Sequence, residues 1–375
     1  MSTCDDQKHV WHHLDAVNIL LQVASYTWSS IGTVFNARFT LAFLLDDSQL
    51  MSLVEIRSIL ESNLRFMRLA SAHYKDDNLV RISIQIEVSG TSLEMDIHHV
   101  DRGDGMSISV KEILECLFRL SLNDALKEEI YFSEEVKDCL MTFTEKGNLA
   151  EAFYALELLL QLSFNEKVQQ DMKQTKSLPL ILRNLVKACD SKVQNRNEQK
   201  LCLHIKNQAE KVFWNLSENE KKVNDDDGPD GVKRGEKQLM LSFCPANEEI
   251  CLKVKQRLEE LDVKVYTSQK PCVSWDHVRG NIDASQLFLM CVSEKYRQSN
   301  DCQLEAKHAS SHNKRMVALI MQQGHDSLAG WMGKIVSSNG VCVDFSKYDF
   351  EECINQLKHI LLSRLQFITV LSRNK

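Results

Sequence analysis

Glu305 is the side chain in this sequence that is best placed to do chemistry. It follows residues 287–293, an apolar run typical of a buried strand, and stands near the start of the predicted helix that comes next. In an open parallel sheet flanked by helices, ligands bind at the edge where the strands end. A carboxylate at that edge can act on a bound substrate, whereas a glutamate on a helix is by default a solvated surface group. Both interpretations stay open at the level of sequence.

Two histidines on the same predicted helix have the spacing of a metal-binding pair. His308 and His312 are four residues apart, so they share one helix face, as zinc ligands can. The sequence shows no third ligand beside them, and Lys307, Lys314 and Arg315 surround the pair. A solvated face is therefore the interpretation, and no metal site is predicted. The chain also has no glycine-rich phosphate loop, so Rossmann or P-loop nucleotide binding has no support.

These side chains must be positioned by a domain in which strands and helices alternate. Five apolar segments with predicted helices between them are expected to be strands, and they cover residues 238–243, 263–266, 287–293, 316–321 and 340–344. Such alternation predicts a parallel, doubly wound sheet, here an α/β domain of flavodoxin-like, five-stranded type. A predicted helix over 350–365 closes the domain.

The chain before this domain is predicted to be helical and contains a repeat. Apolar residues recur at helical spacing from about residue 11 to 71. The segment Leu117-Phe-Arg-Leu-Ser-Leu-Asn123 is echoed 42 residues later by Leu159-Leu-Gln-Leu-Ser-Phe-Asn165, and a looser echo occurs at 212–218. A period of about 40–47 residues is typical of armadillo and HEAT units, which stack because one helical hairpin cannot bury its apolar face alone. We expect an all-α, armadillo-like superhelix; an irregular helical domain with a coincidental echo is the alternative.

Two segments interrupt this organisation. Residues 81–88 alternate with period two and are predicted to form part of an inserted hairpin or an irregular loop. Residues 218–237 are nearly devoid of apolar side chains, so they cannot join a core and are predicted to be a charged, flexible linker. The predicted domains are therefore a helical repeat domain over 1–217, this linker, the α/β domain over 238–365 and a tail over 366–375.

Composition and charge exclude several classes of protein. The chain has 375 residues, 43% of them hydrophobic, and a formal net charge of −7, which fits a multidomain soluble protein without the basic surface of a nucleic-acid binder. Its twelve cysteines form no C-x-x-C pair and lie mostly in apolar runs, which indicates buried thiols in a reducing compartment. No signal-peptide pattern opens the chain, and no apolar run approaches the roughly 20 residues of a membrane helix. We expect a cytosolic protein.

The motifs of the α/β domain resemble those of TIR domains. Leu241-Ser-Phe-Cys244 is similar to the first-strand motif of that family. Leu289-Met-Cys-Val-Ser-Glu-Lys-Tyr296, with Ser299 and Cys302-Gln-Leu-Glu305 after it, is similar to its third strand and following helix. Lys270-Pro271-Cys272 stands in the loop after the second predicted strand, where the BB loop of that family carries its proline. Gly330-Trp-Met-Gly333 resembles a signature of TIR domains joined to armadillo repeats. The whole architecture resembles the armadillo–TIR NADases, without the SAM repeats that separate the two domains there.

This resemblance implies site residues and two activities. Glu305 matches the catalytic glutamate with which such domains cleave the nicotinamide–ribose bond of NAD, a reaction that builds positive charge on the ribose ring. Phe243, Cys244, Ser268 and Cys302 are the expected nucleotide-binding positions. NAD would then be a substrate, and no cofactor is expected. The other activity is self-association through the BB loop, with other TIR domains as partners.

The sequence therefore supports two functional hypotheses. The first is an intracellular signal-transduction protein of an innate-immunity-like kind, whose TIR domain associates with itself or recruits other TIR proteins under the control of armadillo-like repeats. The alternative is an NAD+ hydrolase with Glu305 as the catalytic carboxylate. The acidic residue that usually follows the second strand in the family is missing, because Tyr266 is followed by Thr267 and Ser268. Whether the domain is an enzyme therefore stays open.

Overall fold

The structure is a computed structural model that describes most of the chain in two compact units, Met1–Glu220 and Lys221–Lys375. The described residues are 20, 40–41, 56–76, 80–88, 91–101, 107–133, 136–191, 196–217, 238–268, 274–322, 330–337 and 341–365. The predicted linker, the predicted tail and most of the helices expected before residue 56 lie outside them.

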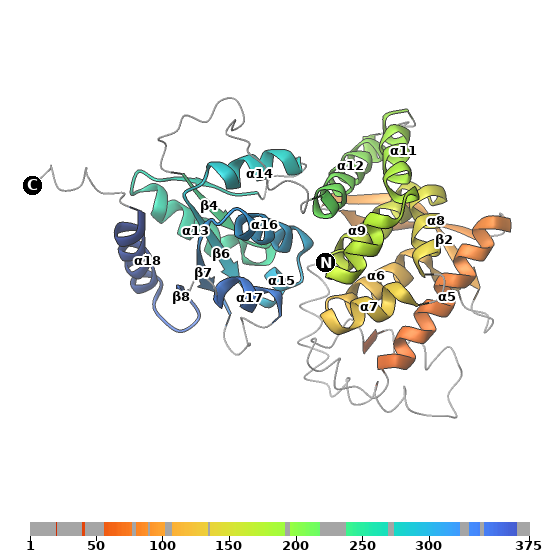
Figure 1. Cartoon of the computed structure of the whole chain (residues 1–375), viewed down its shortest axis with the longest axis horizontal. Helices are drawn as coiled ribbons and strands as arrows, with labels where there is room; N and C mark the ends of the chain where they lie inside the picture. The colour runs from red at the N-terminus through yellow and green to blue at the C-terminus, as the bar shows by residue number, and fades with distance from the viewer. Residues whose placement is uncertain are drawn as a thin grey trace, which may run out of the picture. The chain divides into compact units, whose positions relative to one another are not determined.

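The first unit is built of helices packed around a central one (Figure 1). Its helices are α5 (Ile56–Asp76), α6 (Val110–Ser121), α7 (Asp124–Phe132), α8 (Val136–Lys146), α9 (Leu149–Leu162), α10 (Glu166–Gln174), α11 (Ser177–Ser191) and α12 (Arg196–Ser217). Helix α9 packs against α6, α8 and α12, and its leucines from Leu156 to Leu162 are buried. A helix that is apolar on most sides is stable only when neighbours cover those sides, so α9 organises this core.

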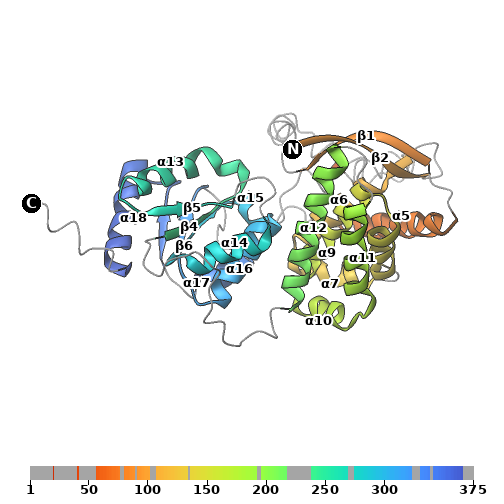
Figure 2. The ribbon, with the colours of Figure 1, turned by 90° about the horizontal axis from the view of Figure 1, so that it is seen from above.

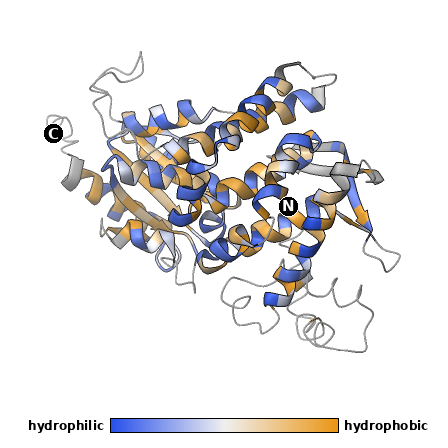
Figure 3. Ribbon diagram, turned by 45° about the vertical axis from the view of Figure 1, so that its right-hand side comes forward, coloured by the Kyte–Doolittle hydropathy of each residue, from blue (hydrophilic) through white to orange (hydrophobic). Residues whose placement is uncertain are grey.

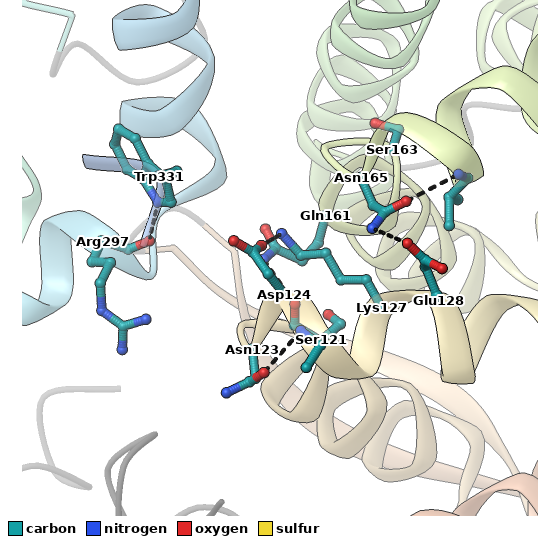
Figure 4. Close-up of polar contacts among 12 residues, drawn as sticks. Ser121, Asn123, Asp124, Lys127, Glu128, Gln161, Ser163, Asn165, Arg297 and Trp331 are labelled. Carbon is teal, nitrogen blue, oxygen red and sulfur yellow. Dashed lines mark hydrogen bonds and ion pairs between the residues drawn. The ribbon is translucent and has the colours of Figure 1, made fainter. Parts of the chain in front are cut away.

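The helices follow the repeat in the sequence. A long, a short and another long helix (α6, α7, α8) are followed by the same order in α9, α10 and α11. The repeated asparagine has a physical reason: the Oδ1 atoms of Asn123 and Asn165 accept hydrogen bonds from backbone N–H groups at the starts of α7 and α10, so each caps the short helix (Figure 4). Gln161 Nε2 donates to the carbonyl of Ser121 at 3.2 Å and links the matching turns. The region is helical as predicted.

A three-stranded antiparallel sheet is inserted in the chain between α5 and α6, and its strands β1 and β2 lie along the outside of the helices (Figure 2). Strands β1 (Val80–Val88) and β2 (Thr91–Asp101) form a hairpin, and β3 (Ser107–Ser109) pairs with β2 and leads into α6. Of the two interpretations of residues 81–88, the hairpin is therefore the right one. The backbone N–H of His98 in β2 donates to Glu151 of α9 at 2.7 Å, so the hairpin is attached to the central helix.

The second unit is a five-stranded parallel sheet with helices on both faces, as predicted. The strand order is β5 (Lys264–Tyr266), β4 (Gln238–Ser242), β6 (Leu287–Val292), β7 (Arg315–Ile320) and β8 (Cys342–Asp344). This is the flavodoxin-like order 2-1-3-4-5. The helical segments are η1 (Pro245–Asn247), α13 (Glu248–Glu259), α14 (Trp275–Ala284), α15 (Glu294–Arg297), α16 (Asn300–Ser311), α17 (Trp331–Ser337) and α18 (Phe350–Leu365). Among the described helices of either unit, none combines the length and the apolar composition that a membrane span requires.

Different helices cover the two faces of this sheet. Successive residues of a strand point to opposite faces. Leu239, Leu241 and Phe243 lie in a core cluster with residues of α13 and α18, whereas α14 and α16 contact the sheet from the other side, to which Ser242 points. Because both faces are buried, the strands are almost continuous apolar runs, as their colouring in Figure 3 shows.

Candidate active site

The candidate site lies at the carboxyl edge of the parallel sheet, where β4 and β6 end side by side. The strand order reverses between these two strands, because the chain passes from β4 to β5 on one side and then to β6 on the other. Ligands of doubly wound folds bind at such a switch point. Ser242, the last residue of β4, pairs in register with Met290 of β6. Side chains at and just beyond Ser242 are therefore placed to meet a ligand.

Glu305 is buried beside this switch point. It lies in the second turn of α16, and only 4% of it is exposed. Its Oε2 accepts a hydrogen bond of 2.6 Å from Ser242 Oγ, a length typical of a charge-assisted bond to a carboxylate. The interpretation of Glu305 as a solvated surface residue is therefore wrong.

A directed chain of hydroxyl groups ends on that carboxylate. Ser242 Oγ lies 2.9 Å from the hydroxyl of Tyr296. A serine hydroxyl has one proton, which here points to Glu305, so Tyr296 donates to Ser242. Tyr296 is fully buried and packs against Trp331, whose Nε1 donates to the carbonyl of Arg297 at 3.1 Å (Figure 4). Ser242 of β4, Tyr296 of α15 and Trp331 of α17 thus form a connected set that fixes the orientation of the Glu305 side chain on α16.

Three titratable groups near Glu305 keep their protons at physiological pH. Burial, with the negative charge of Glu305 as a second cause, raises the pKa of Tyr266 to about 12. Burial also raises the pKa of Tyr296 and the pKa of the Cys302 thiol well above their ordinary values, and the charge of Glu305 adds to both shifts. A thiol is a weak nucleophile when it keeps its proton, so Cys302 is suited to lining the site rather than to attack.

The two cysteines predicted at the site lie at this edge. Cys302 is buried in the first turn of α16, three residues before Glu305. Cys244 follows β4, and its Sγ donates to Asn247 Oδ1 at 3.2 Å. Ser293 Oγ, just after β6, donates to the same oxygen at 2.6 Å. Asn247 therefore ties the ends of β4 and β6 together beside Cys244.

The other predicted binding residues are placed differently. Phe243 packs into the core on the α13 side of the sheet, the face opposite Ser242. Ser268 follows β5 and is half-buried. Pro271, the proline of the predicted BB loop, lies outside the described residues. Of these positions, the structure brings Cys302 into the surroundings of Glu305 and turns Phe243 away.

Sequence reasoning missed Ser242, Tyr266 and Tyr296. Ser242 could have been found from the alternation of side chains along β4, since Phe243 and Ser242 must point to opposite faces of the sheet. Tyr266 ends β5 just as Ser242 ends β4, so the ends of adjacent parallel strands indicated both. Tyr296 could not be found from the sequence, because its place depends on the turn after β6. In that turn Ser293 accepts a hydrogen bond from the backbone N–H of Tyr296 at 3.1 Å.

The prediction of a solvated histidine face is wrong for His308. This residue is 1% exposed, its Nε2 lies 2.8 Å from Asp283 Oδ1, and its ring packs edge-on against Trp275. Helix α14 covers this side of α16, which spacing along one helix does not reveal. His312 is exposed, as predicted.

The strand order and the polar groups at the switch point define the class of the second unit: a flavodoxin-like α/β domain with a carboxylate at its ligand-binding edge. Residues 239–358 match the family described as TIR domain. The chain thus carries a TIR domain after a helical region. A search among curated proteins gave no match to the chain.

Proposed function

We propose that the TIR domain cleaves the nicotinamide–ribose bond of NAD. The observation that supports this function is the buried Glu305 carboxylate, held by Ser242 at 2.6 Å at the switch point of the sheet. Burying a carboxylate costs free energy even when hydrogen bonds compensate part of the cost. Groups kept in such surroundings cluster at functional sites.

The reaction uses the negative charge of Glu305 and one water molecule. The bond between C1′ of the ribose and the nicotinamide nitrogen breaks, and both electrons leave with nicotinamide, which becomes neutral. The positive charge that builds on the ribose ring is stabilised by the carboxylate. Water then attacks C1′ and loses a proton, so the products are nicotinamide, ADP-ribose and H⁺.

The other side chains at this edge position that carboxylate. The hydrogen bonds from Tyr296 to Ser242 and from Ser242 to Glu305 fix its orientation before substrate arrives. A preorganised charge stabilises a transition state without reorganisation at the moment of reaction. The raised pKa of Cys302 keeps the thiol protonated, so it does not compete with water for the ribose.

Nicotinamide release by the purified full-length chain tests this function. The wild-type chain should consume NAD, and Glu305→Gln should reduce turnover by about 10²- to 10³-fold, the range for loss of one electrostatic group from an active site. Glu352→Gln, an exposed glutamate on α18, is the matched control and should turn over NAD like the wild type. Equal rates for the wild type and Glu305→Gln would refute the enzymatic proposal.

Association with other TIR domains is the second function, and the family match over 239–358 supports it. In this proposal the chain is a cytosolic signalling protein of innate-immunity type, in which armadillo-like repeats control assembly through the BB loop. The wild type is expected to show a concentration-dependent rise in light scattering, and Pro271→His should abolish it. Glu305→Gln should assemble normally, which separates this proposal from the enzymatic one. Unchanged scattering by Pro271→His would count against it.

A further inference from the structure

We propose that Asp283, His308 and His312 bind a divalent transition-metal ion such as Zn²⁺. Asp283 comes from α14 and His308 from α16, and His312 is the residue that caps the end of α16. One ligand atom from each lies within 4.8 Å of the others. The pair on α16 has the i, i+4 spacing of helical zinc ligands, and the fold supplies a third ligand that the sequence did not reveal.

The distances fit a site that closes with small side-chain movements. Zinc binds nitrogen and oxygen at about 2.0–2.2 Å, so tetrahedral ligand atoms are roughly 3.3–3.6 Å apart. His308 Nε2 and Asp283 Oδ1 are 2.8 Å apart, and the ring centroids of His308 and His312 are 4.1 Å apart. His308 is held by packing against Trp275, whereas Asp283 and His312 are exposed, so their side chains have room to adjust around the ion. The exposed side leaves a fourth position for water.

The hydrogen bonds of the ligands suit metal binding. His312 Nδ1 lies 3.0 Å from the carbonyl oxygen of His308, so this nitrogen donates and Nε2 keeps its lone pair for the ion. His308 Nε2 lies 2.8 Å from Asp283 Oδ1, so these two ligand atoms already face each other.

Two positive charges near the site limit its affinity. Lys314 Nζ donates to the backbone carbonyls of Asp283 and Ser285, the second at 3.1 Å. Arg279 pairs with Asp276 on α14. Each charge repels a cation, and each is already engaged by neighbouring groups. We therefore expect weaker binding than at a four-ligand structural site.

Metal binding would join two helices of the TIR domain. Asp283 lies in the last turn of α14, and His308 lies one helical turn after Glu305 on α16. An ion that binds only the folded arrangement stabilises it by mass action. The expected consequence is a metal-dependent rise in the melting temperature of the TIR domain, whether or not the domain turns over NAD.

Cobalt binding to the reduced, metal-free full-length chain tests this site. Tetrahedral Co²⁺ with nitrogen and oxygen ligands gives visible absorption bands without the near-ultraviolet charge-transfer band that thiolates cause. One equivalent of Co²⁺ should give this spectrum, and Zn²⁺ should displace it. His312→Ala removes an exposed ligand and should weaken binding by at least about 100-fold, the upper end of the cost of losing an outer-shell partner. Asp283→Asn should weaken it as well.

His359→Ala is the matched control, because this histidine is exposed on α18, away from the three ligands. It should bind Co²⁺ like the wild type, and Zn²⁺ should raise the melting temperature of both but not that of His312→Ala. A wild-type chain that gives no such spectrum would overturn the proposal. So would a spectrum that survives in His312→Ala, since the ion would then be held elsewhere, for example by cysteines.

Discussion

The two units each bury a glutamate on a helix, and the partners of the two carboxylates differ. Glu151 on α9 is 0% exposed and accepts hydrogen bonds from the backbone N–H groups of Asn148 and His98, at 3.1 and 2.7 Å, and both of its oxygens lie 2.9 Å from His98 Nδ1. Glu305 on α16 is 4% exposed and accepts a hydrogen bond from the side chain of Ser242. Burial alone therefore does not separate a structural carboxylate from a chemical one.

The place of the partners in the fold makes the difference. Asn148 and Glu151 form a capping box at the start of α9, and the contacts from His98 attach the hairpin to that helix. These partners hold the fold together. Ser242 instead stands at a strand end, the edge where doubly wound sheets bind ligands, and its hydroxyl donates to Glu305. We infer that Glu151 stabilises the protein, whereas Glu305 is the candidate for the proposed reaction.

The largest expected effect on stability follows from Glu151→Ala. This change leaves the N–H groups of Asn148 and His98 without their buried acceptor, at about 1–3 kcal/mol for each, and removes half of the capping box. The helical unit should lose about 3–4 kcal/mol of unfolding free energy, measured by hydrogen exchange of the α9 amides. Glu305→Gln should change the stability of the TIR domain by less than about 1 kcal/mol, because it removes a buried charge and keeps an acceptor. Equal losses in the two variants would contradict the comparison.

The pH dependence of the helical unit should carry the signature of Glu151. Burial raises the pKa of this carboxyl to about 7 from its ordinary value of 4.5, although the hydrogen bonds from His98 and Asn148 oppose the shift. The folded state therefore binds the Glu151 proton more tightly than the unfolded state does. The stabilisation that this protonation gives the folded state is complete below about pH 4.5 and is lost as pH rises through about 7. Relative to Glu151→Gln, the wild type should lose about 3 kcal/mol of unfolding free energy between pH 4 and pH 8. A difference that does not change with pH would show that the group titrates normally.

Ser242→Ala should separate orientation of Glu305 from its charge. The variant keeps the carboxylate but removes the hydroxyl that holds it, so kcat for NAD should fall by about 10- to 100-fold, less than for Glu305→Gln. Ser242→Thr, which restores a hydroxyl, should recover part of the rate. Full activity of Ser242→Ala in a nicotinamide-release assay would mean that the hydrogen bond is only structural.

Tyr296→Phe should have the smallest effect. It removes the donor to Ser242 and leaves the hydrogen bond from Ser242 to Glu305 in place. A loss of about 2- to 5-fold in kcat is expected, since one neutral hydrogen bond contributes about 0.5–1.5 kcal/mol. The packing of the ring against Trp331 is kept, so the melting temperature should change little. A larger kinetic loss than in Ser242→Ala would reverse the assumed direction of the hydroxyl chain.

Much of the fold could be predicted from the sequence, because local patterns of apolar and capping residues determine the helices and strands. Apolar runs separated by helical segments predicted the parallel sheet, and α18 begins and ends at the predicted residues, Phe350 and Leu365. The repeated asparagines marked real helix starts at α7 and α10. Strand β2 (Thr91–Asp101) was not predicted as a separate strand, although Leu93-Glu-Met-Asp-Ile97 alternates with the period of two that is typical of strands.

The candidate site could be predicted only in part, because its contacts join distant segments. The place of Glu305 near a strand end followed from the order of the elements. Its partner Ser242 is 63 residues away in the sequence, and the contact depends on which face of β4 meets α16. In the same way, Asp283 meets His308 only because α14 packs on α16. Spacing along the chain reveals pairs on one helix, and the third member of each set requires the fold.

The central claim is that Glu305, and not burial as such, supports NAD cleavage. The most direct measurement is nicotinamide release by the wild type, Glu305→Gln and Glu151→Gln, each shown by circular dichroism to be folded at the assay temperature. The account predicts that Glu151→Gln turns over NAD like the wild type, whereas Glu305→Gln loses at least about 100-fold. Release of nicotinamide by Glu305→Gln at the wild-type rate, or the absence of turnover in all three, would contradict it.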